Sequence, residues 1–253
     1  MFTKAIVRTP SKSMVFGLTT ANLGTPNYDL ALMQHNEYIK ALTKCGLQVT
    51  VLPPDEDYPD STFVEDTALL TKKCAIISNP GAPSRKGEIK EIKQVLKHHY
   101  SVIEHIEAPG TVEPGDIMMA GDHFYVGLSQ RTNDDGAAQV ITILNKYGYS
   151  GSAVMLNEML HLKTGVSYLE NNNLLAFGEF LSEEQFQDFN IIEIDEDESY
   201  AANSVWVNGY VLVPKGFPKT SNKIINAGYP IIELDVSEFR KLDGGLSCLS
   251  LRF

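Results

Sequence analysis

The sequence has few cysteines. Only Cys45, Cys74 and Cys248 occur in 253 residues, and an odd number in a chain of this length argues against a disulfide framework and for a reducing compartment. No stretch approaches the roughly 20 apolar residues that a membrane-spanning helix needs. The apolar run near the N-terminus is interrupted and too brief for a signal peptide. We therefore expect a soluble, cytoplasmic protein.

Basic segments are missing as well. The formal net charge is −11, and no Lys/Arg run or basic amphipathic helix is visible, so neither a nucleic acid nor a membrane is the expected partner. A cationic small ligand suits this charge. The Gly-x-Gly-x-x-Gly phosphate loop of a doubly wound dinucleotide fold is absent, and Cys45 and Cys74 form no zinc-ligand pattern.

What the sequence does contain is a repeat. Two short apolar runs split by a turn, then a helical stretch, then another apolar run recur along the chain. The four clear copies begin at Ala68, Ile117, Val166 and Val205. In the fourth copy, Asn208-Gly209 separates the paired runs, and this dipeptide tolerates the positive φ angles of a type I′ hairpin turn.

The chain ends supply a fifth copy. A helix near Leu30 to Leu42, a strand at Val49 to Leu52, and a terminal strand at Leu246 to Leu251 paired with Phe2 to Val7 would complete it. Repeats of about 50 residues bury their faces on their neighbours. The pattern thus predicts one α/β domain over residues 1–253, a pseudo-symmetric ring of five ββαβ units. A doubly wound sheet is the competing fold.

Polar residues occupy matching positions in this repeat. Glu65, Glu113 and His161 precede the first strand of successive copies and are 48 residues apart, and Cys248 lies in the strand that opens the fifth copy. Each taken alone is more often structural: a cysteine in a strand is usually a buried apolar residue, and acidic residues at turns are often caps. Their common position in the repeat favours convergence on one site.

The chemistry of this set suggests a cationic substrate. A cysteine nucleophile needs a base or a cationic neighbour to populate its thiolate, and His161 would supply one. Nearby carboxylates would oppose ionisation of the thiol unless the substrate were positive, as a guanidinium is. Arg85 and Arg131 follow the second strands of two adjacent copies, and arginine forks hold carboxylates bidentately. These residues therefore predict an arginine-like ligand.

Five stretches carry a family resemblance that spans nearly the whole chain. They are Pro59-Asp-Ser-Thr-Phe-Val-Glu-Asp-Thr-Ala, Ile106-Glu-Ala-Pro-Gly-Thr-Val-Glu-Pro-Gly-Asp-Ile, Leu160-His-Leu-Lys-Thr-Gly, Ser199-Tyr-Ala-Ala-Asn and Asp243-Gly-Gly-Leu-Ser-Cys. With them the sequence resembles the guanidino-group-modifying (amidinotransferase, or pentein) superfamily, and within it is similar to the dimethylarginine dimethylaminohydrolase family. The resemblance implies a five-bladed α/β propeller.

The resemblance also implies residue roles. Cys248 would be the nucleophile, His161 the general acid and base, and Glu113 a carboxylate that holds the guanidinium and orients the histidine. The implied substrate-binding positions are Leu18, Asp60, Glu65, Asp66, Arg85, Arg131 and Leu242, of which Leu18 and Leu242 would act through their backbone carbonyls. Gly244 and Gly245 would let the backbone approach the substrate.

The expected reaction is hydrolysis of Nω-methylated arginine to citrulline and a methylamine through a covalent thiouronium, without metal or organic cofactor. A small-molecule substrate is the expected partner, and a homodimer is left open. An arginine deiminase acting on unmethylated arginine, an amidinotransferase and a non-catalytic propeller used for binding are the alternatives. The complete set of Cys248, His161 and Glu113 favours an enzyme over a binding module.

Overall fold

The computed structural model describes residues 1–253, which divide into two compact units. The first unit comprises Met1–Val64 and Ile194–Phe253, and the second comprises Glu65–Glu193. Each unit has its own hydrophobic core. The interpretation of residues 1–253 as one catalytic domain stays a prediction.

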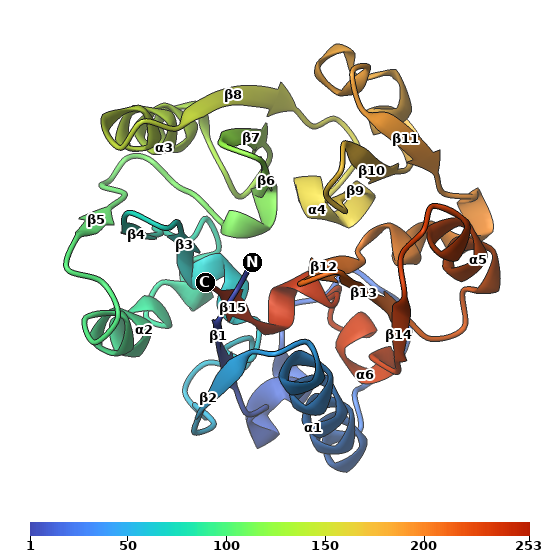
Figure 1. Cartoon of the computed structure of the whole chain (residues 1–253). Coiled ribbons are helices and arrows are strands. Elements are labelled where there is room, and N and C mark those ends of the chain that lie inside the picture. The colour runs from blue at the N-terminus through green and yellow to red at the C-terminus, as the bar shows by residue number, and fades with distance from the viewer. The chain divides into compact units, whose positions relative to one another are not determined.

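The second unit contains three sheets of three strands each (Figure 1). They are β3 (Ala68–Leu70), β4 (Ala75–Ile77) and β5 (Ile103–His105); β6 (Ile117–Ala120), β7 (His123–Leu128) and β8 (Ser150–Met155); and β9 (Val166–Tyr168), β10 (Asn173–Ala176) and β11 (Asn190–Glu193). In every sheet the first two strands are antiparallel, and the third is parallel to the second. A parallel third strand requires a crossover connection, so each sheet is one ββαβ repeat.

The crossovers of the second unit are helical. They contain α2 (Ile89–Leu96), α3 (Asp134–Lys146) and the short 3₁₀ helices Gly178–Ser182 and Glu184–Phe186. Asn133 caps α3 by accepting a hydrogen bond from the Gly136 amide, which satisfies one of the unpaired N–H groups of the first turn. A separate 3₁₀ turn, Pro83–Arg85, comes before α2.

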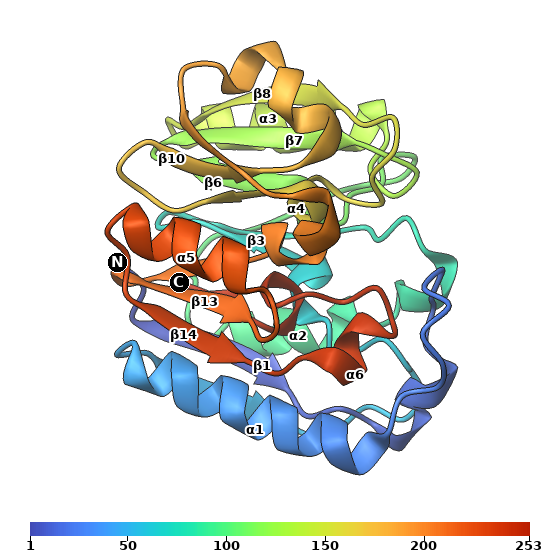
Figure 2. The same cartoon turned by 90° about the vertical axis from the view of Figure 1, so that its right-hand side faces the viewer.

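The first unit contains the other two sheets. They are β1 (Lys4–Arg8), β2 (Gln48–Leu52) and β15 (Leu251–Arg252), and β12 (Val205–Val207), β13 (Tyr210–Pro214) and β14 (Ile231–Leu234). The helices of this unit are α1 (Tyr28–Lys44), α5 (Pro218–Asn226) and α6 (Ser237–Arg240). Figure 2 shows the helices of this unit, of which α1 contacts β2 and β14, and α5 contacts β14. The five predicted repeats are thus confirmed.

The hairpin of the fourth repeat and the terminal strand of the fifth both agree with the prediction. Asn208 and Gly209 have φ angles of 50° and 94° and join β12 directly to β13, where Val207 pairs with Tyr210, as the type I′ turn requires. The last strand does pair with the first, since Ala5 lies opposite Arg252 and Ile6 opposite Leu251.

The prediction that Cys248 lies in the terminal strand is wrong. Residues Ser247–Leu249 form a 3₁₀ turn, and β15 begins only at Leu251. The turn precedes the strand in the same way that the 3₁₀ helix Val64–Thr67 precedes β3. Cys248 therefore occupies the position in the repeat that Glu65 occupies, although it lies outside the strand. No helix of the structure combines the length and apolar character needed to cross a membrane.

The core of the first unit buries a histidine. His35 lies on the inner face of α1 with 1% of its surface exposed, and its Nε2 has no hydrogen-bond partner. Burial lowers the pKa of His35 from 6.5 to about 4, because the imidazolium would be poorly solvated there.

We expect this histidine to make folding pH-dependent. The unfolded chain takes up a proton near pH 6.5 while the folded chain does not until about pH 4. Stability is therefore lost as the pH falls between these values, by up to about 3 kcal/mol. Urea unfolding at several pH values should show the loss, and His35→Gln should flatten it. The same change at the exposed His98 is the control; an unaltered slope in His35→Gln would refute the assignment.

Candidate active site

Three predicted residues lie at the predicted position, just before the first strand of each sheet in the second unit. Glu65 lies in the 3₁₀ helix Val64–Thr67 ahead of β3, and Glu113 precedes the turn Pro114–Asp116 ahead of β6. His161 is the N-cap residue of α4 (Leu162–Gly165), which leads directly into β9. The repeat thus delivers side chains of different chemistry to one region of this unit.

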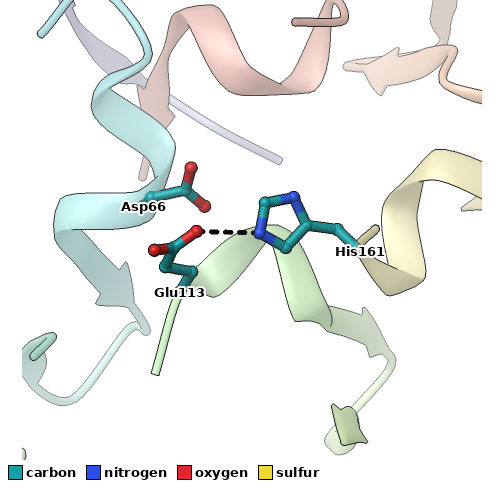
Figure 3. A group of neighbouring side chains, drawn as sticks. All are labelled: Asp66, Glu113 and His161. Carbon is teal, nitrogen blue, oxygen red and sulfur yellow. Dashed lines mark hydrogen bonds and ion pairs between the residues drawn. The ribbon is translucent and has the colours of Figure 1, made fainter. Parts of the chain in front are cut away.

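Asp66, Glu113 and His161 form a cluster, in which two buried carboxylates face the edge of the partly exposed imidazole ring (Figure 3). Nε2 of His161 lies 2.9 Å from Oε2 of Glu113. One ligand-type atom from each of the three residues lies within 4.8 Å of the others. Two carboxylates and an imidazole are therefore held within reach of a single small group.

The carboxylate of Glu113 is fixed from several sides. Its Oε1 accepts a hydrogen bond from the Ala82 amide at 3.0 Å, and its own amide donates to Oγ1 of Thr132 at 3.1 Å. Nη1 of Arg131 lies 3.8 Å from Oε1. Because its side chain is only 1% exposed, Glu113 has little freedom to turn away from His161.

Asp66 is held by a backbone amide and a buried arginine. Its Oδ1 accepts from the Gly115 amide at 2.8 Å, and its Oδ2 accepts from Nη1 of Arg85 at 2.5 Å. The remaining edge of the Arg85 guanidinium donates to Glu88 through Nε and Nη2. Arg85 therefore supports Asp66 in this structure, and its predicted contact with a substrate carboxylate stays a prediction.

The charges of the cluster are set by its packing. Burial lowers the pKa of His161, but the hydrogen bond with Glu113 and the charges of Asp116, Asp66 and Glu113 outweigh it and raise that pKa to about 9. Burial raises the pKa of Asp66, but the charges of Arg85 and His161 and the Gly115 amide hold it below its ordinary value. At neutral pH the cluster thus presents a carboxylate beside an imidazolium.

This protonation state decides which cation the cluster suits. A metal ion binds the lone pair of a neutral imidazole, so it would have to displace the proton that His161 holds up to about pH 9. Each carboxylate oxygen can accept two hydrogen bonds, so Asp66 and Glu113 can receive N–H donors besides those already present. A guanidinium, which donates from a planar fork, matches these acceptors better than a metal ion does.

The second unit also contains the predicted residues Glu65 and Arg131. Oε1 of Glu65 pairs with Nζ of Lys163 at 2.6 Å. The Arg131 side chain is 24% exposed, compared with 7% for Arg85. Of the two predicted carboxylate-binding arginines, Arg131 is the one that a solute can reach.

Three predicted residues lie together in the first unit. The Leu18 amide donates to Oδ1 of Asp60 at 3.0 Å. A Cβ built at Gly17 would lie 2.8 Å from Oδ1 of Asp60 and 3.3 Å from Cδ1 of Leu242. The loop that carries Leu18 is therefore pinned against Asp60 and Leu242, and only glycine fits at its closest point.

Cys248 lies in a turn built on two glycines. The Gly245 amide donates to Sγ of Cys248 at 3.4 Å. A Cβ at Gly244 would come within 2.2 Å of the Phe63 ring, and one at Gly245 within 2.4 Å of the Asn203 amide. The two glycines are thus required by packing inside the protein, which is a different reason from the substrate approach that the sequence suggested.

Two buried acidic residues of this region were not predicted from the sequence. Glu88, which pairs with Arg85 at 2.8 Å, had a sequence signal in its spacing of three residues from Arg85. Asp116 has none of its surface exposed and accepts hydrogen bonds from Ser129 and from the Leu162 amide. Asp116 belongs to the Glu113-Pro-Gly-Asp stretch, but a turn aspartate is usually a cap, so nothing in the sequence distinguishes it from a structural residue.

Comparisons with known proteins agree with this geometry. The family model described as N,N dimethylarginine dimethylhydrolase, eukaryotic, matches residues 22–250. The N(G),N(G)-dimethylarginine dimethylaminohydrolase of Pseudomonas aeruginosa is 60% identical over 100% of both chains, and that of Streptomyces coelicolor is 31% identical over 98% of this chain and 96% of its own.

Solved structures extend the match to three dimensions. A crystal structure of a cysteine-to-serine mutant of the Pseudomonas aeruginosa enzyme complexed with citrulline has a TM-score of 0.99 and 59% identity, with 100% of both chains covered. The N-terminal domain of ArgZ, an arginine dihydrolase from cyanobacteria, has a TM-score of 0.90 at 19% identity, with 100% of this chain and 97% of that chain covered. The predicted five-bladed α/β propeller, the pentein fold, is thereby confirmed, and the chain belongs to the dimethylarginine dimethylaminohydrolase family.

Proposed function

We propose that this protein hydrolyses Nω,Nω-dimethyl-L-arginine to L-citrulline and dimethylamine, and Nω-methyl-L-arginine to L-citrulline and methylamine. The observation that carries the proposal is the cluster of Asp66, Glu113 and His161, two carboxylates beside an imidazolium. Such a cluster can bind a guanidinium and still hold a proton for a departing amine. The similarity to a relative complexed with citrulline gives independent support.

In the first half of the reaction, the thiolate of Cys248 attacks the guanidinium carbon and forms a C–S bond. Asp66 and Glu113 accept hydrogen bonds from the guanidinium, which keeps the carbon electrophilic and the group oriented. The C–N bond to the dimethylated nitrogen then breaks, and His161 gives its proton to that nitrogen. Dimethylamine departs, and a thiouronium cation remains on Cys248.

In the second half, His161 is neutral and takes a proton from water as the water attacks the thiouronium carbon. The C–S bond breaks, the thiolate of Cys248 returns, and citrulline is released. A second proton leaves to solvent, where the released dimethylamine takes it up. Dividing the hydrolysis into two steps lets one histidine serve first as acid and then as base.

The amino-acid end of the substrate needs its own contacts. We assign its carboxylate to Arg131 and Arg85, and its α-amino group to the carbonyls of Leu18 and Leu242. The partial exposure of the Arg131 side chain supports the first assignment. The position of Leu18 against Asp60 and Leu242 supports the second, because it fixes the loop that carries the carbonyl.

Product analysis tests the function directly. Citrulline should form from dimethylarginine with stoichiometric dimethylamine, and arginine should yield citrulline at least about 10²-fold more slowly. Such a ratio corresponds to about 2.7 kcal/mol of differential transition-state binding. Comparable rates on both substrates would make the protein an arginine deiminase instead. If neither substrate yields citrulline, the hydrolase function is refuted.

Two expectations from the sequence belong to the same proposal. All three cysteines are thiols rather than disulfides, which supports a reducing compartment such as the cytoplasm. The sequence leaves the oligomeric state open, and sedimentation velocity would decide whether the protein forms a homodimer.

A further inference from the structure

Asp116 lies at the centre of a buried hydrogen-bond network next to the cluster. Its Oδ1 accepts from the Leu162 amide at 3.0 Å, and Leu162 follows His161 in the chain. Its Oδ2 accepts from Oγ of Ser129 at 2.7 Å, and the Thr132 hydroxyl also donates to it. A fully buried carboxylate needs several donors of this kind to offset its lost hydration.

The same hydroxyls continue the network to other site residues. Oγ of Ser129 accepts from the Arg131 amide at 2.9 Å, and Oγ1 of Thr132 accepts from the Glu113 amide at 3.1 Å. Each hydroxyl therefore receives a backbone N–H from a site residue and donates its own hydrogen to Asp116. A hydroxyl that accepts one bond and donates another has a defined orientation, which makes the network directional.

Packing leaves this carboxylate no alternative position. A Cβ built at Gly127 would lie 3.3 Å from Oδ1 of Asp116 and 3.0 Å from Cβ of Leu162. Leu162, Thr132 and Asp116 each have none of their surface exposed. The backbone of β7 thus closes over the bond between Asp116 and Leu162, and a larger residue at 127 would push them apart.

We propose that Asp116 is a positioning residue for the hydrolysis, whose single carboxylate holds the backbone segments that carry His161, Glu113 and Arg131 in one fixed arrangement. The inference deepens the proposed function and rests on it. Asp116 does not touch the substrate in this scheme. Asp116 acts because its two carboxylate oxygens anchor all three segments. The segment of His161 is bonded directly, through the Leu162 amide. The segments of Glu113 and Arg131 are bonded through the hydroxyls of Thr132 and Ser129.

The test uses Asp116→Asn, an isosteric change that places an N–H₂ group where one of the donors now points. The displaced donor loses its acceptor, so the attached segment moves. We expect kcat/KM for dimethylarginine to fall by about 10²-fold, the effect of a displacement near 1 Å. The control is Asp122→Asn, which removes a carboxylate from an exposed turn of the same sheet and should leave kcat/KM unchanged.

A second variant separates the arms of the network. Ser129→Ala removes the acceptor of the Arg131 and Thr132 amides and one donor to Asp116, but it retains the bond between Asp116 and Leu162. It should raise KM by about 5- to 10-fold, because the segment that carries Arg131 loses its anchor, with kcat changed less than about 2-fold. If Asp116→Asn does not fold, this KM increase without loss of kcat still tests the proposal, and loss of kcat alone would contradict it.

A titration that needs no turnover completes the test. The charged groups facing His161 are Asp66, Glu113 and Asp116, with Arg85 paired to Asp66 and Arg131 near Glu113. NMR titration of the His161 ring in folded Asp116→Asn should show a pKa at least about 1 unit lower than in the wild type. Wild-type protein inactive on dimethylarginine would refute the proposed function, whereas active wild type with fully active, folded Asp116→Asn would refute the positioning role.

Discussion

Cys248→Ser is expected to lower kcat for dimethylarginine by at least about 10⁴-fold, the scale of loss when a nucleophile is removed from a covalent mechanism. Serine keeps the shape of the side chain, but a hydroxyl is far less acidic than a thiol. The variant should retain its melting temperature to within a few degrees, since Cys248 is only partly buried in its turn. The measurement is citrulline release over hours at high enzyme concentration.

The matched control is Cys74→Ser. Cys74 is buried and lies 3.5 Å from the Thr71 hydroxyl, so a serine there keeps a polar partner while Cys248 stays intact. Its kcat should remain within about 2-fold of the wild type, because Cys74 takes no part in the proposed reaction. If Cys248→Ser hydrolyses dimethylarginine as fast as Cys74→Ser, the thiouronium scheme is wrong.

Glu113→Gln is expected to lower kcat by about 10²-fold or more, the contribution of a well-placed general acid. The amide is nearly isosteric with the carboxylate but carries no charge. Glu113 opposes the effect of burial on His161 both by its hydrogen bond and by its charge. Without them the imidazole would be largely neutral at pH 7 and could not protonate the departing amine.

The pH dependence of kcat/KM should change in a defined direction in Glu113→Gln. His161 has a pKa of about 9, so the wild type should keep its acid form at neutral pH and lose kcat/KM as the pH rises through 9. In Glu113→Gln the alkaline limb should move to lower pH by at least about 1 unit. The exposed Glu107→Gln serves as the control. An alkaline limb that stays near 9 in Glu113→Gln would show that Glu113 does not set the charge of His161.

Much of the fold could be predicted because its signals are local. The paired apolar runs and the Asn208-Gly209 turn are visible within a few residues. Because the same order of elements recurs, a clear copy of the repeat supports the prediction of a less clear one. The strand ends agree with the structure to within a few residues. The turn that contains Cys248 was not predictable in this way, since three residues of 3₁₀ helix have no periodicity to recognise.

The site, too, was predictable only in part. Glu113 and His161 could be paired from the sequence because the repeat places them 48 residues apart in equivalent positions. The pairing of Arg85 with Asp66 could not be identified, because the repeat places Arg85 and Arg131 in matching positions while their surroundings differ. Arg85 is enclosed by Asp66 and Glu88, and Arg131 is not. Such differences depend on which side chains fill the space around each copy.

The short helical turn before the first strand of each sheet has a consequence for how such proteins diversify. The turn carries Glu65 and Asp66 in one repeat, Asp116 in the next, and Cys248 in the fifth, while the strands that follow keep their apolar pattern. A point mutation in one turn can therefore alter a single reactive group and leave every core intact. An ancestral chain could exchange nucleophile, acid or cation-binding carboxylate one repeat at a time, and so explore new chemistry without first becoming unstable.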